Sequence, residues 1–198
     1  MIKNIALRIE ESVNNLDSLN GEIRFTREEQ LYLCEHFEPV ELCKNEYLLR
    51  QGETEKYFYF VEQGILRYWT PDGEDREITV HFAMEGEFAG SYRSMKKGEP
   101  SRFHIQAIGK AVVWRMERKH LAGIYSFSLN FNRAVRVFFE DLHSRQANRE
   151  ICLKLPAEER YRYLLQQEKE ILLSVPLKLI SSYLGITPQT LSRIRRTC

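Results

Sequence analysis

The sequence predicts an α+β chain: an N-terminal antiparallel β jelly-roll barrel, then one long helix, then a small C-terminal helix-turn-helix domain. From Val40 to Met116 apolar residues recur with a period of two, which is typical of strands. From about Glu117 the period becomes helical, and the last stretch combines short apolar segments with a glycine turn. We expect three parts, at residues 1–128, 129–153 and 154–198.

The composition is that of an ordinary globular chain, with 198 residues, 43% hydrophobic residues and a net charge of +1. The first 17 residues are amphipathic and carry Glu10 and Glu11, so they do not resemble a secretory signal. No run approaches the roughly 18 apolar residues of a membrane span. We therefore expect a cytoplasmic protein without a membrane partner.

The cysteines are scattered, and no Cys-x-x-Cys pair is present among Cys34, Cys43, Cys152 and Cys198. Zinc and iron–sulfur sites usually need such clusters. We expect free, reduced thiols, no metal and no resident cofactor.

A capping box opens the first helix that the sequence marks clearly. Thr26 can cap the helix, and Glu29 can reach back to the Thr26 amide. Pro39 predicts that this helix ends before it.

The region of period two contains short apolar or aromatic runs separated by turn residues, namely YLLRQ, YFYFVEQGILRYW, REITVHF and AVVWRM. Strands of this length and spacing predict a β-sandwich or a small jelly-roll barrel. Pro71-Asp72-Gly73 predicts a hairpin turn, because proline presets φ and glycine tolerates positive φ.

A long helix is predicted from about Asn130 to Leu153. Its apolar stripe has steps of four, three and four residues and consists of Phe131, Val135, Phe138 and Leu142. The side of the helix opposite this stripe is expected to carry the charged residues Arg133, Arg136, Glu140, Arg145 and Arg149. A further helix is predicted after Pro156.

The stretch from Leu177 to Ile194 has the pattern of a helix-turn-helix. Ile180, Leu184, Leu191 and Ile194 supply apolar positions, while small Ser181 permits close packing of the second helix. Gly185 stands at the turn, where a positive φ is expected. Thr187 can cap the second helix and Pro188 fits its first position.

The outward side of the second helix carries residues suited to DNA. The candidate DNA-binding residues are Thr187, Gln189, Thr190, Ser192, Arg193, Arg195 and Arg196. Glutamine can pair with adenine and arginine with guanine in the major groove, while the last two arginines suit phosphates. From Ile151 onward the net charge is +4, against −3 for the remainder. A helical hairpin with a solvated basic face is the alternative.

Taken together, these segments resemble the Crp/Fnr family of bacterial transcription regulators. LLRQGETEKYFYFVEQGILRYW is similar to the opening strands of the family's cyclic-nucleotide-binding-type barrel, EGEFAGSY to the start of its phosphate-binding cassette, and SSYLGITPQTLSRI to its DNA-reading motif. The resemblance implies an effector-sensing barrel, a DNA-binding domain, and a homodimer formed by the long helix through Phe131, Val135, Phe138 and Leu142. The alternative is that this stripe packs only on the chain's own barrel, and we expect it to do both. It also implies a pseudo-palindromic DNA operator, with RNA polymerase as a further candidate partner.

The cassette departs from that of cyclic-AMP-binding relatives at both charged anchors. Ser91 follows Gly90 where those relatives have glutamate, and Ser101 stands where they have arginine. A buried phosphodiester without its arginine would be costly, so we do not expect a response to cyclic AMP. The effector-pocket candidates are Gly90, Ser91, Tyr92, Arg93, Ser101 and Arg102. We interpret this segment as a solvated basic loop around an empty or degenerate pocket. Binding of another anion to the basic residues of this loop is an open alternative, and the sequence does not identify the effector.

Two other functions are alternatives. One is a small-molecule-binding barrel protein with a vestigial helix-turn-helix. The other, an enzyme on a cupin-like barrel, would need a His-x-His metal pair, whereas His81 and His104 are isolated, so we expect no enzyme. If an effector acts, we expect it to change the packing of the junction between the barrel and the long helix, from about Gly123 to Asn130.

Overall fold

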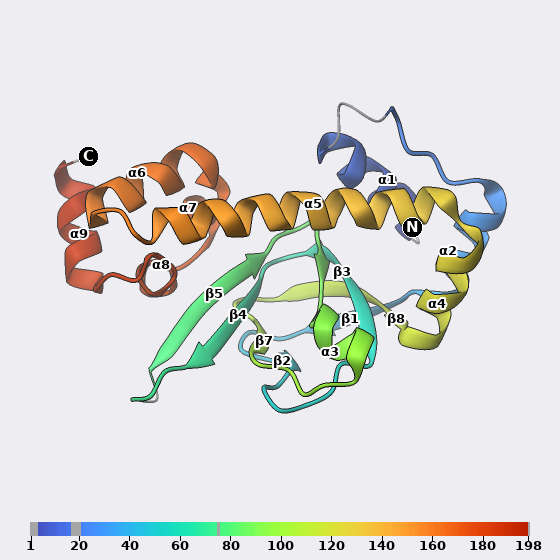
Figure 1. Ribbon diagram of the computed structural model, residues 1–198, viewed down its shortest axis with the longest axis horizontal. Helices are drawn as coiled ribbons and strands as arrows, with labels where there is room; N and C mark the ends of the chain where they lie inside the picture. The colour runs from blue at the N-terminus through green and yellow to red at the C-terminus, as the bar shows by residue number, and fades with distance from the viewer. Residues whose placement is uncertain (1–3, 17–20, 75, 198) are drawn as a thin grey trace.

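Two four-stranded antiparallel sheets form the β part of the computed structural model, which describes residues 4–16, 21–74 and 76–197 (Figure 1). One sheet has the order β1 (Glu38–Leu42), β8 (Ala111–Glu117), β3 (Tyr57–Gln63) and β6 (Phe88–Ala89). The other has the order β2 (Tyr47–Leu49), β7 (His104–Ala107), β4 (Leu66–Pro71) and β5 (Glu77–Ala83). The sheets do not join into a closed barrel among the described residues, so the predicted jelly-roll is two packed sheets.

The two sheets share one apolar core. Tyr59 and Val61 of the first sheet pack with Leu66, Tyr68 and Ile105 of the second. Alternate residues of each strand point into this core, which is why the sequence shows a period of two. The predicted strands and their antiparallel pairing are therefore confirmed.

Three helices pack around the start of the long helix. They are α1 (Ile5–Leu16) and α2 (Arg27–His36) from the N-terminal region and α4 (Arg118–Phe127), which directly precedes the long helix. The predicted capping box is present, because the Thr26 amide donates to Glu29 and the Glu29 amide donates to the Thr26 hydroxyl. The Glu29 carboxylate also accepts a hydrogen bond from Ser128, whose own hydroxyl caps α5. One buried carboxylate thus ties the start of α2 to the start of α5.

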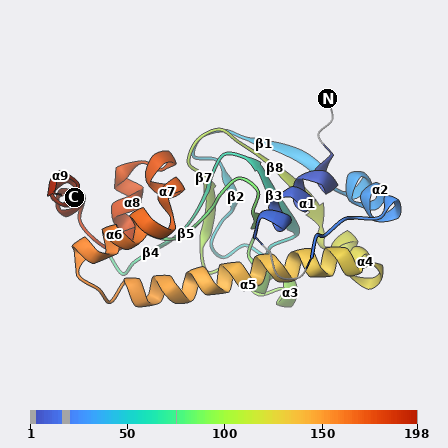
Figure 2. The same cartoon turned by 90° about the horizontal axis from the view of Figure 1, so that it is seen from above.

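The long helix α5 (Leu129–Cys152) runs along the β part, and the C-terminal helices lie at its far end (Figures 1 and 2). Phe131, Val135 and Phe138 are at most 6% exposed, because they pack on α1 and on the first sheet. Leu142 is half-buried and borders a cavity. Three of the four residues predicted for a dimer seam therefore lie in the chain's own core. None of the described helices is long and apolar enough to cross a bilayer.

The C-terminal helices form a core of their own. They are α6 (Ala157–Gln167), α7 (Lys169–Ser174), α8 (Leu177–Leu184) and α9 (Pro188–Thr197). Ile180, Leu184, Leu191 and Ile194 are almost fully buried there, as their spacing predicted. Ile65 and Phe82 of the β part complete this core, so the two parts of the chain are packed together.

The solvated basic loop predicted around Arg93 is instead a short helix, α3 (Tyr92–Lys97), which ends at Gly98 with φ 71°. Ser94 and Met95 on this helix are buried. The Arg93 side chain is paired with Glu99 at 2.6 Å, which leaves fewer free cations than the sequence indicated.

We predict that Phe131→Ala lowers the free energy of unfolding by about 3–5 kcal/mol, because it leaves a cavity between α1, α5 and the first sheet. Leu173→Ala is the control: this leucine on α7 is 75% exposed, and its removal should cost at most about 0.5 kcal/mol. Chemical denaturation followed by circular dichroism measures both changes. Equal losses in the two variants would contradict the packing described here.

Candidate functional site

The turn between α8 and α9 is built as the sequence predicted. Gly185 adopts the left-handed conformation with φ 64°, and the Ile186 amide donates back to the Ser181 carbonyl at 3.0 Å. Ser181 is buried, so α9 can pack closely on α8. Thr187 caps α9 by accepting a hydrogen bond from the Thr190 amide at 3.1 Å.

Arg160 on α6 holds this turn from behind. Its guanidinium donates to the carbonyl of Leu155 at 2.7 Å and to that of Leu184 at 2.9 Å. Leu184 is the last residue of α8, where backbone acceptors lack helical partners, and Leu155 lies in the turn between α5 and α6. The arginine therefore fixes the end of α8, and with it the start of α9, relative to the long helix.

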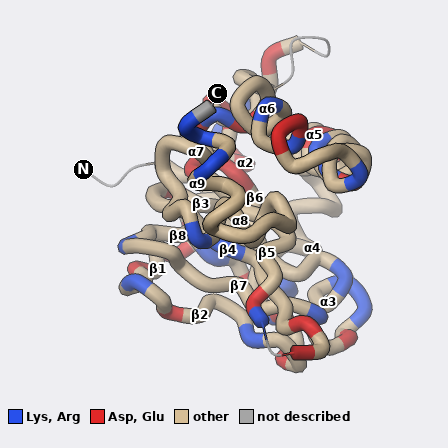
Figure 3. The backbone as a smooth tube through the Cα atoms, turned by 90° about the vertical axis from the view of Figure 1, so that its left-hand side faces the viewer, with Lys and Arg blue, Asp and Glu red and all other residues tan. Residues whose placement is uncertain are grey.

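The outer side of α9 presents most of the candidate DNA-binding residues to solvent. Exposed side chains are those of Thr187, Gln189, Ser192, Arg193, Arg195 and Arg196. Thr190 differs, since it is half-buried and its hydroxyl lies 2.9 Å from that of Thr187. Figure 3 shows basic residues along α9 at this end of the molecule. The arrangement is a short helix with one polar, basic side that no described residue covers.

The helix-turn-helix is docked on β5, an edge strand. The Ser182 hydroxyl of α8 accepts from the Thr79 amide and donates to the Glu77 carbonyl, each at 2.9 Å. It thereby pairs two edge groups that would otherwise need water. Phe82 packs against Tyr183 with ring centroids 5.3 Å apart.

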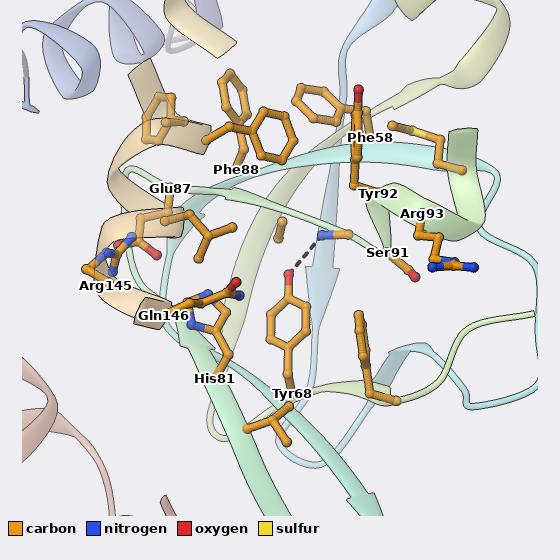
Figure 4. Close-up of a pocket in the computed structure, with 18 of the residues that line it drawn as sticks. Phe58, Tyr68, His81, Glu87, Phe88, Ser91, Tyr92, Arg93, Arg145 and Gln146 are labelled. Atoms are coloured by element: carbon orange, nitrogen blue, oxygen red, sulfur yellow. Dashed lines mark hydrogen bonds and ion pairs between the residues drawn. The ribbon is translucent and has the colours of Figure 1, made fainter. Parts of the chain in front are cut away.

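A cavity of about 390 Å³ lies between the sheets, α3 and α5 (Figure 4). Gly90, Ser91, Tyr92 and Arg93 border it, as the sequence predicted for an effector pocket. The other two candidates do not: Ser101 is buried against its own loop, and Arg102 is exposed to solvent. Leu142, predicted for the dimer seam, is part of the wall.

The backbone amides of the cassette already have partners within the chain. The Gly90 amide donates to the Tyr68 hydroxyl at 2.8 Å, and the Ser91 amide faces the Glu55 carboxylate at 3.4 Å. Glu55 is 3% exposed, and burial raises its pKa. A phosphate at these amides would have to displace a phenol and approach a buried carboxyl group.

A set of charged residues connects the cavity with the C-terminal helices. Glu87 pairs with Arg145 at 2.8 Å, and Arg145 lies 2.7 Å from Asp141. One turn further along α5, Arg149 donates to the carbonyls of Thr79 and Tyr183. These contacts correct the prediction that Arg145 and Arg149 lie on the side of α5 opposite its apolar stripe.

Sequence reasoning missed most of the cavity wall, including Tyr68, His81, Glu87 and Gln146. A signal was available for α5 alone. Arg145 follows Phe138 by seven residues, which is about two helical turns, so both lie on the same side. For the strand residues, no spacing in the sequence indicates that they meet.

The β part of the chain matches a known domain family. Residues 39–126 match the cyclic nucleotide-binding domain family. No curated protein matches the chain. FixK2 from Bradyrhizobium japonicum is similar in structure, with a TM-score of 0.69 and 20% identity over 81% of this chain and 83% of that one.

Two further solved structures are similar over most of their length. The c-di-GMP responsive global regulator CLP of Xanthomonas campestris has a TM-score of 0.67 and 15% identity, over 87% of this chain and 91% of that one. A transcriptional regulator of the CRP family from Thermus thermophilus has a TM-score of 0.64 and 17% identity, over 80% and 83%. The chain has the Crp/Fnr fold. The resemblance inferred from the sequence is thereby confirmed for the fold.

In this Crp/Fnr fold, His81 borders the cavity, and its pKa reports how far the cavity disfavours a positive charge. Burial and the neighbouring Arg145 and Arg149 lower the pKa of His81 to about 3, from an ordinary value of 6.5. As the pH falls below 6.5, His81 becomes protonated in the unfolded chain but stays neutral in the folded chain. The contribution of His81 to the free energy of unfolding should therefore decrease by up to about 1.4 kcal/mol for each pH unit below 6.5.

We predict that His81→Phe removes this contribution, so that its stability falls less between pH 7 and pH 5 than that of the unaltered chain. Burial raises the pKa of Glu87 and of Glu168, which acts in the opposite direction but equally in both proteins. Urea denaturation at a series of pH values measures the difference. Parallel stability curves would show that His81 is protonated normally in the folded chain.

Proposed function

We propose that this protein is a sequence-specific DNA-binding transcription regulator of the Crp/Fnr type that acts as a homodimer. The observation that carries the proposal is the solvent-facing side of α9, where Gln189 and Arg193 stand on a helix fixed by the Gly185 turn. A helix of this kind fits the major groove, and these side chains can read base edges there. A vestigial motif would have no need of a buried Ser181 and a formed Thr187 cap.

Dimer formation is proposed for α5, but on a different side from the predicted seam. The predicted residues have little surface left, because Phe131, Val135 and Phe138 fill the chain's own core. The adjacent exposed side carries Arg136 and Glu140, which pair within one helix at 3.0 Å. A second copy along this side would bring two reading helices to one DNA duplex, at half-sites roughly 34 Å apart.

We infer that cyclic AMP is not the effector. Both charged anchors of the cassette are absent, and the Gly90 and Ser91 amides face Tyr68 and Glu55 of the same chain. Glu55 would repel a phosphodiester at short range if ionised, and would lose its backbone partners if displaced. The chain's own groups thus act in place of a bound anion.

Regulation is proposed to pass through β5 rather than through the segment between Gly123 and Asn130. A register shift in the β4–β5 pairing places Tyr68 opposite His81 and Trp69 opposite Thr79, which leaves Val80 as the extra residue. Val80 and His81 border the cavity, while Thr79 and Phe82 hold α8 and Tyr183. A ligand that moves the bulge would therefore change how the DNA-reading helices are held.

We predict that Arg193→Ala weakens binding to the preferred DNA by ~1–3 kcal/mol and relaxes one base preference. The site is first selected from a random duplex library with the full chain, and affinities follow from fluorescence anisotropy. Arg162→Ala is the control, since this exposed arginine lies on α6 and pairs with Glu158. It should leave the affinity within about 0.5 kcal/mol, because an exposed ion pair contributes little.

Arg196→Ala is predicted to act on phosphate contacts. It should weaken all duplexes alike and reduce the slope of log affinity against log salt by about 1. If the full chain binds no duplex in a salt-dependent way, or if the selected site has no two-fold symmetry, the proposal of a dimeric regulator fails.

A further inference from the structure

We propose that the cavity beside α5 binds an uncharged small molecule with a flat ring and a hydrogen-bonding group, and that this class of molecule is the effector. The inference deepens the proposed function, on which its regulatory part rests. The binding part stands on the cavity alone. It excludes nucleotides and other anions as the main ligands.

The walls of the cavity are aromatic on opposite sides. On one side Tyr68 of β4 contacts Phe103, which directly precedes β7, with ring centroids 5.2 Å apart. On the other side Phe88 packs on Phe138 at 4.6 Å, and Tyr92 packs on Phe139 at 4.6 Å. Ring faces and edges favour a flat, apolar guest, and a volume of about 390 Å³ is within the range of small-molecule sites.

The charged groups of the wall are already neutralised. Arg145 is paired with Glu87 and Asp141, and Arg93 is paired with Glu99 at 2.6 Å. These two arginines are the only cations in the lining among the described residues. An anionic ligand would therefore need to break an existing ion pair, and Glu55 behind the cassette amides opposes it further.

Neutral hydrogen-bonding groups remain available. Tyr68 accepts from the Gly90 amide, so its own hydroxyl proton is free to donate (Figure 4). His81 and Gln146 lie on the same side of Tyr68 in this view, and neither side chain has a hydrogen bond to another described residue. Burial keeps the pKa of His81 low, so its imidazole is neutral and offers one donor and one acceptor. An uncharged polar group on the ring would satisfy these residues.

The first experiment titrates the full-length protein with N-phenyl-1-naphthylamine, an uncharged two-ring fluorophore. Competitors are 2-naphthol and 2-naphthoate, which share a ring system and differ in charge at neutral pH, together with cyclic AMP. We expect saturable fluorescence that 2-naphthol displaces at a concentration at least about tenfold lower than 2-naphthoate does, a difference of about 1.4 kcal/mol. Stronger displacement by 2-naphthoate or by cyclic AMP would overturn the proposal.

The second experiment locates the bound probe. Val80→Phe fills the cavity from β5 and should weaken binding of the fluorophore at least about tenfold. Ile78→Phe is the matched control, because Ile78 lies on the same strand, is 40% exposed and does not border the cavity. If Val80→Phe does not fold, Leu142→Trp fills the cavity from α5, with exposed Leu173→Trp as its control. Unchanged binding in a folded cavity-filling variant would place the probe elsewhere.

The two proposals can fail separately. DNA binding is measured on the same preparation with and without 2-naphthol. Loss of all DNA binding with probe binding intact would remove the regulator and leave the ring-binding site. DNA binding with no displacement by 2-naphthol would remove the ligand class and leave the regulator.

Discussion

The burial of one side of α5 along its whole length is the constraint on which the rest of the structure depends. The first half of the helix meets an ordinary apolar core through Phe131, Val135 and Phe138. In the second half the partner is no longer a filled core but a cavity and then the C-terminal helices. There the same side continues with Leu142, Arg145 and Arg149. The helix thus changes from apolar packing to ion pairs and hydrogen bonds at the point where the cavity begins.

That change has an energetic reason. Arginines have long apolar stems and a head group that can reach several acceptors, so they can cover a gap that leucine would leave open. Arg145 is only 30% exposed in its side chain, and such a desolvated cation is tolerable because Glu87 and Asp141 both lie beside it. Arg149 is held by two backbone carbonyls and lies over the Tyr183 ring at 4.6 Å. Arg149 therefore links α5 to β5 and α8 through backbone carbonyls, while Arg145 links α5 to the turn before β6 through its ion pair with Glu87.

The parts that the sequence predicted well are those in which neighbours in the chain determine the structure. The Thr26 capping box, the Gly185 turn and the Thr187 cap each depend on residues within a few positions. The cavity wall could not be predicted in this way, because His81, Glu87 and Tyr92 belong to separate elements that only the fold brings together. The charge of Arg145 and Arg149 predicts the side of α5 away from the apolar stripe, whereas their spacing of seven residues from Phe138 and Leu142 predicts the buried side, where the structure has them. The basic residues between Tyr92 and Lys97 likewise predict a solvated loop, but the segment is a helix because Ser94 and Met95 are buried against the rest of the chain.

The position of β5 explains why a neutral ligand could matter at α9, more than 100 residues away in the chain. A ligand can shift an equilibrium only by the difference in its affinity for two arrangements. The Val80 bulge supplies a local element with alternatives, since a bulged residue is left out of the strand pairing. Its neighbours Thr79 and Phe82 contact α8 through the Ser182 hydroxyl and the Tyr183 ring, beside the bridge that Arg149 makes between the Thr79 and Tyr183 carbonyls. A change of about 1–2 kcal/mol at the bulge would be comparable with one of those hydrogen bonds, whereas it is smaller than the loss of about 3–5 kcal/mol expected when the Phe131 core is opened. On the mechanism proposed above, the contact between β5 and α8 is therefore where a ligand bound at the bulge would change the position of the DNA-reading helices.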